Sequence, residues 1–305
     1  MYGIRSTSLS TASFNLRSSL TVGIMSAQPQ RHGPAQSVST RPYQAAVALS
    51  NMGVTLIERQ SYADAVITIR DALFLIRAFA DPERHTNESL PTYEDIQYMI
   101  HRATNCLLYN SIPDIDAAST SCLKLKILSD HQSSVLDIFS AVNDADMYLV
   151  RIDDTINPIE DYASAFTIHS KASAILLNYG TACQCLHLAK RGAINGSSNT
   201  GERGDIEILE EAMLFLKISY RILIRQMEPI IRFQDNKNLM IAEMEVTRTL
   251  NLTALVLQTL INVCNKLGQI DELRSFRYEF DSVCTTITKI RAAHLWRYNE
   301  TAPSA

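Results

Sequence analysis

The stretch that decides the fold is residues 43–79, which read YQAAVALSNMGVTLIERQSYADAVITIRDALFLIRAF. Its second half carries apolar side chains at three- and four-residue spacing, which places them on one face of a helix. These positions are Tyr62, Ala65, Val66, Ile69, Ala72, Leu73 and Ile76. The polar pair Gln60-Ser61 interrupts the pattern. We therefore expect two helices, one over 43–58 and one starting at Tyr62, that fold back on each other as a hairpin.

The same periodicity predicts that most of the remaining chain is helical, so the fold class is all-α. Further helices are expected near 92–109, 131–142, 158–190, 205–226, 237–267 and 269–298. The run Met147-Tyr148-Leu149-Val150-Arg151-Ile152 is the β-like exception, and we interpret it as an extended connector. Glycine, serine and asparagine dominate 192–204, which predicts a flexible loop. We thus expect a helical domain over 43–298, with an irregular insertion at about 80–157 and a short tail over 299–305.

The first 42 residues differ in composition from everything that follows. They contain arginine and many serine and threonine residues but no acidic residue, since the first one is Glu58. A disordered tail is the interpretation we favour, and a mitochondrial or plastid transit peptide is the alternative. No apolar run reaches the roughly 20 residues that a membrane span needs. Most of the six cysteines lie singly in helical patterns, which is typical of reduced thiols. We expect an intracellular and most simply cytoplasmic protein.

A short pattern recurs in three helix pairs. The first pair reads Leu49-x-x-Met52-Gly53-x-x-Leu56 followed by Ala65-x-x-x-Ile69, and the second reads Leu176-x-x-Tyr179-Gly180-x-x-Cys183 followed by Ala212-x-x-x-Leu216. A weaker third copy reads Leu257-x-x-Leu260-Ile261-x-x-Cys264, then Leu273. Small residues at 53, 65, 180 and 212 suit positions where two helices nearly touch. The pattern resembles the tetratricopeptide repeat, W-x2-L-G-x2-Y followed by A-x3-F. The departures are Leu49 for the tryptophan, Arg77 for the terminal proline, Ile261 for the small residue and Arg277 for the second aromatic.

The resemblance implies a superhelical stack of helix hairpins with a concave groove that binds a peptide or a protein segment. The groove positions are taken from the first helix of each pair, one residue past the small position and one turn to either side. They are Ser50, Val54, Ile57, Leu177, Thr181, Gln184, Gln258, Asn262 and Asn265. Of the Lys, Arg and Asn set that a clamp for a chaperone's terminal carboxylate needs, only Lys266 is a nearby cation. The function we expect is therefore that of a scaffold or adaptor with a protein partner of another kind.

Enzymatic motifs are missing from the sequence. It contains no G-x-G-x-x-G, G-x4-G-K-[ST], H-E-x-x-H or G-x-S-x-G. In Cys183-x-Cys185-x-His187 the middle cysteine points about 200° away from the first on a helix, so we expect no metal site. We accordingly expect no catalytic residue and no cofactor. An all-α enzyme whose active site is built from distant residues is one alternative.

Charge argues against a nucleic-acid partner, which is the other alternative. Lysine and arginine number 28 against 32 acidic residues, a formal net charge of -4, whereas a polyanion binder needs a basic excess. The most basic stretch, Lys217 to Arg232, is diluted by nearby acidic residues such as Glu228.

The last expected helix carries a heptad pattern. Its apolar positions are Leu273, Phe276, Phe280, Val283, Ile287 and Ile290, followed by His294. We favour pairing with an antiparallel helix of the same chain, and a homodimeric coiled coil is the alternative.

Overall fold

The computed structural model describes residues 41–80, 91–109, 125–129, 147–152, 164–194, 202–232 and 239–301. Within these ranges the chain is mostly helical, as the sequence predicts. The helices are α1 (Arg41–Glu58), α2 (Tyr62–Ala80), α3 (Tyr93–Tyr109), α4 (Ser164–Ile194), α5 (Glu202–Arg232), α6 (Leu239–Leu267) and α7 (Ile270–Thr301). Two short strands, β1 (Leu125–Ser129) and β2 (Met147–Arg151), complete the described elements. The expected tail over 1–42, except its last two residues, and the expected helix over 131–142 lie outside the described residues, as do residues 302–305.

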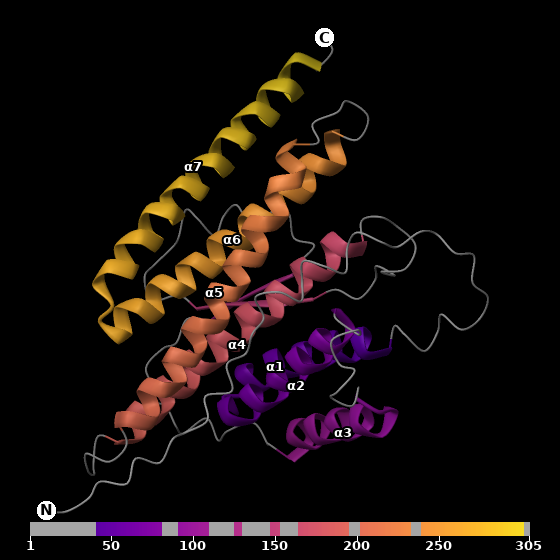
Figure 1. Ribbon diagram of the computed structural model, residues 1–305, viewed down its shortest axis with the longest axis vertical. Coiled ribbons are helices and arrows are strands. Elements are labelled where there is room, and N and C mark those ends of the chain that lie inside the picture. Colours follow the sequence, from indigo (N-terminus) through magenta and orange to yellow (C-terminus); the bar gives the residue numbers. More distant parts are fainter. Residues whose placement is uncertain are drawn as a thin grey trace, which may run out of the picture.

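The helix hairpins pack on one another in chain order (Figure 1). Helix α2 contacts α4, α5 contacts α6, and α7 covers α6 at the far end, while α3 lies against α1 and α2. The first helices of the three hairpins form one layer, in which α4 contacts both α1 and α6. This layer matters for function because β2 contacts all three of its helices.

Two hairpin turns share the same backbone geometry. Between α1 and α2, Gln60 adopts a left-handed φ of 62°, and the Ser61 amide donates to the Leu56 carbonyl at 2.9 Å. Between α6 and α7, Gly268 has φ 68°, and the Gln269 amide donates to the carbonyl of Cys264 at 3.0 Å. This is the helix-ending motif in which a left-handed residue lets the chain cap the last turn and reverse.

The glycines predicted to lie at close helix contacts do so. A Cβ built on Gly180 would lie 2.7 Å from Cγ of Leu216, and one built on Gly53 would lie 2.9 Å from Cδ1 of Ile69. Real Cβ atoms do not approach other atoms so closely, so larger residues would push the helices apart. In both hairpins the contacted residue follows a fully buried alanine by four positions, Ala65 or Ala212.

The short parallel sheet was not part of the all-α expectation. Strand β1 pairs with β2 in a register that places Leu125 opposite Met147 and Ser129 opposite Arg151. The extended conformation of 147–152 agrees with its β-like sequence. Strand β1 was missed because five residues give too short a pattern, and their pairing with β2 is a contact between distant segments. The sheet and α3 both belong to the region predicted as an irregular insertion.

Several helix ends extend beyond their predicted limits. Helix α4 continues to Ile194 and α5 starts at Glu202, so both ends of the predicted loop over 192–204 are helical, and 195–201 lie outside the description. Helix α3 starts where predicted because Thr92 and Asp95 cap each other's backbone amides, at 3.1 and 2.8 Å.

Helix α7 packs its apolar stripe against its own chain. Val283 and Ile287 are buried, and Phe276, Phe280 and Ile290 pack on the same core. The intrachain pairing with α6 therefore uses the positions that a homodimeric coiled coil would need. None of the helices in the described ranges is both long and apolar enough to cross a bilayer.

Candidate functional site

The backbone of the segment 147–152 is held by two asparagine side chains from different helices. Asn178 of α4 accepts a hydrogen bond from the Val150 amide at 2.8 Å and donates to the Val150 carbonyl at 2.7 Å. Asn51 of α1 makes the same pair of bonds with Ile152, at 2.9 and 2.8 Å. A carboxamide offers one acceptor and two donors, so each asparagine satisfies both backbone groups of one residue.

A hydroxyl group extends this row of contacts. Thr181 lies almost one turn after Asn178 on α4, and its hydroxyl donates to the carbonyl of Tyr148 at 2.9 Å. The helix side chains thus reach every second residue of the strand, at 148, 150 and 152. Backbone groups of alternate residues point to opposite edges of a strand. The edge that the helices leave free pairs with β1, so β2 has partners on both sides.

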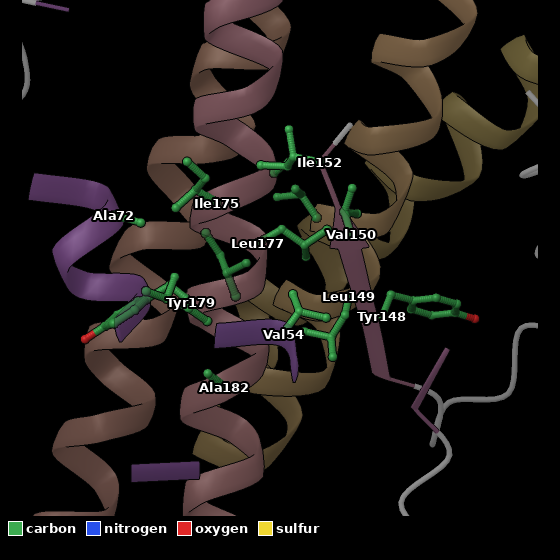
Figure 2. Packing of buried hydrophobic residues seen from close by; sticks show 14 of the residues in the cluster. Val54, Ala72, Tyr148, Leu149, Val150, Ile152, Ile175, Leu177, Tyr179 and Ala182 are labelled. Atoms are coloured by element: carbon green, nitrogen blue, oxygen red, sulfur yellow. The ribbon is translucent and has the colours of Figure 1, made fainter. Parts of the chain in front are cut away.

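The first four side chains of β2 and the side chain of Ile152 are almost completely buried. Residues Met147 to Val150 are at most 5% exposed, and Ile152 is 2% exposed. Figure 2 shows Leu149 beside Val54 of α1, with Tyr148 on the opposite side of the strand. The sulfur of Met147 lies 3.8 Å from that of Cys185 in α4. The layer of α1, α4 and α6 therefore holds an extended segment by both its backbone and its apolar side chains.

We call the part of α1 and α4 that contacts this segment the strand-binding face, formed by Ser50, Asn51, Val54, Asn178 and Thr181. Asn178 has no exposed surface and also donates to the hydroxyl of Ser50 at 3.2 Å. Burying a polar group costs free energy unless it finds a hydrogen-bond partner. The backbone of β2 supplies that partner, so the buried asparagine and the strand depend on each other.

The residues predicted to line an open groove lie mostly inside the protein. Seven of them are buried, namely Ser50, Val54, Ile57, Leu177, Thr181, Gln184 and Gln258. Asn262 is half-buried and Asn265 is exposed. The expectation that these side chains face solvent is therefore wrong for the seven. The physical reason at the strand-binding face is β2, which lies beside Val54 and accepts a hydrogen bond from Thr181, while Ser50 is bonded to Asn178. Whether the nine positions bind a partner stays a prediction.

Sequence reasoning missed both asparagines, although the sequence carries a signal for them. Each lies two residues before a close-contact glycine, as Asn51-x-Gly53 and Asn178-x-Gly180. The third copy has Thr259-x-Ile261 at the corresponding place. A polar residue that recurs beside a helix contact is expected to lie on the same helix face each time. One polar segment that contacts both asparagines could therefore have been inferred.

A second polar cluster joins α2, α4 and α5. The phenol of Tyr179 donates to Glu211 at 2.7 Å, and Arg70 donates to Tyr179 at 2.8 Å and to Glu211 at 3.0 Å. Burial raises the pKa of Tyr179 well above its usual value, so the phenol remains a neutral donor. Burial, together with the carboxylate of Glu211, raises the pKa of the neighbouring Cys183 to about 12. This thiol stays protonated at neutral pH and is a poor nucleophile.

The two neighbouring cysteines of α4 do not converge. Cys183 lies near Tyr179 and Glu211, whereas Cys185 contacts Met147 of β2. Burial raises the pKa of Cys185 to about 12 as well. In the part of the chain that the structure covers, no three His, Cys, Asp or Glu side chains come together in a way that could hold a metal ion.

Comparison of the chain with protein-family models, curated proteins and solved structures gives no match.

Proposed function

We propose that this protein is an interaction module of divergent tetratricopeptide-like hairpins, whose strand-binding face receives an extended segment of a partner protein. In this proposal residues 147–152 are the chain's own occupant of the face, and a partner segment takes their place. The module works as an adaptor and carries out no catalysis.

The observation that carries the proposal is the double hydrogen bonding of Val150 and Ile152 by Asn178 and Asn51. On the side of the bound segment these bonds use backbone groups only. The two asparagines would therefore hold any extended segment that has an amide hydrogen at those two positions. Backbone bonds of this kind provide affinity in peptide recognition, while pockets for side chains provide specificity. The shared Asn-x-Gly pattern in α1 and α4 also supports hairpins of one repeated type.

An intramolecular occupant competes strongly with a partner. A tethered segment acts at an effective concentration of about millimolar, so a free peptide with the same contacts is at a disadvantage. A chain with a weakened resident strand should therefore bind peptide better. Val150→Pro provides this weakening, because proline lacks the amide hydrogen that bonds to Asn178.

The test uses a fluorescent peptide with the sequence of residues 145–154, added to the full chain. We expect Val150→Pro to bind it at least about tenfold more tightly than the wild type does, given the competing tether. The control peptide carries proline in place of Val150 and should bind neither protein. Adding Asn51→Ala and Asn178→Ala to the Val150→Pro chain should abolish binding.

Binding should also raise the melting temperature of Val150→Pro, because a ligand that binds only the folded state stabilises it. If neither the wild type nor the variant binds the peptide while both remain folded, the strand is a permanent part of the core and the proposal is wrong.

A further inference from the structure

The segment 147–152 carries one charged residue, Arg151, and this side chain is more exposed than its neighbours. Arg151 is half-exposed, whereas Met147 to Val150 and Ile152 are buried. Its guanidinium lies 2.5 Å from Oε2 of Glu58 and 3.3 Å from the hydroxyl of Thr55, both on α1. The Thr55 hydroxyl donates its own hydrogen to the Asn51 carbonyl at 3.1 Å, which leaves its oxygen free to accept from arginine.

One row of side chains on α1 therefore contacts the end of the occupant. Asn51, Thr55 and Glu58 follow each other at helical spacing. Asn51 binds the backbone of Ile152, and the other two bind the side chain that precedes it. The backbone contact fixes the register, so residue 151 of any segment bound in this way is placed opposite Glu58.

Glu58 is an unusual residue at its position. It is the last residue of α1, where the helix dipole disfavours a carboxylate, and the last turn holds no basic residue. The adjacent Arg59 is directed elsewhere, since it donates to the carbonyl of Leu107 in α3. The cation that pairs with Glu58 is thus Arg151 of the segment 147–152.

We propose that Glu58 is a specificity residue that selects a basic side chain in the bound partner segment. The partner then carries an extended stretch of the type apolar–apolar–basic–apolar, matching Leu149 to Ile152. This inference rests on the proposed function, because it assumes that the resident strand resembles the segment that replaces it.

The test measures peptide affinity in the full chain with Val150→Pro and Arg151→Gln, which leaves Glu58 without its resident cation. Three labelled peptides of residues 145–154 carry Arg, Gln or Glu at position 151. We expect the Arg peptide to bind about tenfold more tightly than the Glu peptide, since exposed charge pairs are individually weak and the reversal adds repulsion. The preference should shrink at about 1 M salt.

The matched variant is Glu58→Arg in the same chain. It should reverse the order of the Arg and Glu peptides, and a cation at this helix end is favourable for α1 itself. Equal affinities for the three peptides in both chains would overturn the role of Glu58 and leave the proposed function intact. If no peptide binds to either chain, the proposed function fails and this inference fails with it.

A second measurement needs no peptide and no weakened strand. In the otherwise unchanged chain, Arg151→Glu should lower the melting temperature by about 2–4 °C, and adding Glu58→Arg should recover most of the loss. A double variant that melts no higher than Arg151→Glu alone would show that the two charges do not interact, and would overturn the inference.

Discussion

Asn178 is a fully buried amide whose side chain bonds to a strand and to Ser50 of a neighbouring helix rather than to its own helix. From sequence alone, Ser50, Thr181 and Gln184 were placed in an open groove because of their spacing from the small residues Gly53 and Gly180. They are buried, and Ser50 and Thr181 have partners there, since β2 and Asn178 satisfy their hydroxyl groups. The spacing therefore predicted which residues share a helix face but not that this face is buried. The missing information was a contact between residues about 30 to 100 positions apart.

This role of Asn178 can be tested by truncation. Asn178→Ala removes both partners of Val150 and leaves a buried amide and carbonyl unsatisfied. We expect a loss of about 2–4 kcal/mol in the free energy of unfolding, measured by urea denaturation. Asn265→Ala on the exposed part of α6 is the control and should change stability by less than about 0.5 kcal/mol. A loss for Asn178→Ala as small as that of the control would contradict the structural role.

At the level of the elements, local pattern was enough to find most helices. The start of α2 and the break between α6 and α7 were predicted at the correct residues because Gln60-Ser61 and Gly268 interrupt clear apolar stripes. The close contacts at Gly53 and Gly180 were also predicted, since small residues at a fixed spacing have a direct steric meaning. The helix ends near 194 and 202 were not predicted, because glycine and serine in those segments favour a loop locally.

The two equivalent turns allow a reciprocal prediction. Gln60 has a left-handed φ that costs a side-chain-bearing residue free energy, whereas glycine adopts it readily. Gln60→Gly should therefore stabilise the protein by about 0.5–1 kcal/mol despite the greater entropy of the unfolded chain. Gly268→Gln should destabilise it by about 1 kcal/mol through backbone strain alone, since a Cβ there meets no atom within 4 Å. Thermal unfolding of both variants measures these changes, and a destabilising Gln60→Gly would contradict the turn geometry.

In the whole molecule, β2 connects helices that are far apart in sequence. Val150 of β2 is bonded to Asn178 of the second hairpin, and Ile152, which directly follows β2, is bonded to Asn51 of the first, so the segment fastens α1 to α4 across the layer. Figure 1 shows the strands crossing the middle of the helical array. The mostly helical class follows from periodicity, but the position of an extended segment follows from tertiary contacts. This is why the sequence predicted its conformation and not its site.

The central claim is that the two asparagines hold the backbone of residues 147–152 in the folded protein. Amide hydrogen exchange of Val150 and Ile152 in the full chain tests it most directly. If the claim is correct, both amides exchange at least about 100-fold more slowly than in an unstructured peptide, and Asn178→Ala accelerates Val150 more than Ile152. Exchange of both amides at the unprotected rate in a folded protein would contradict the claim.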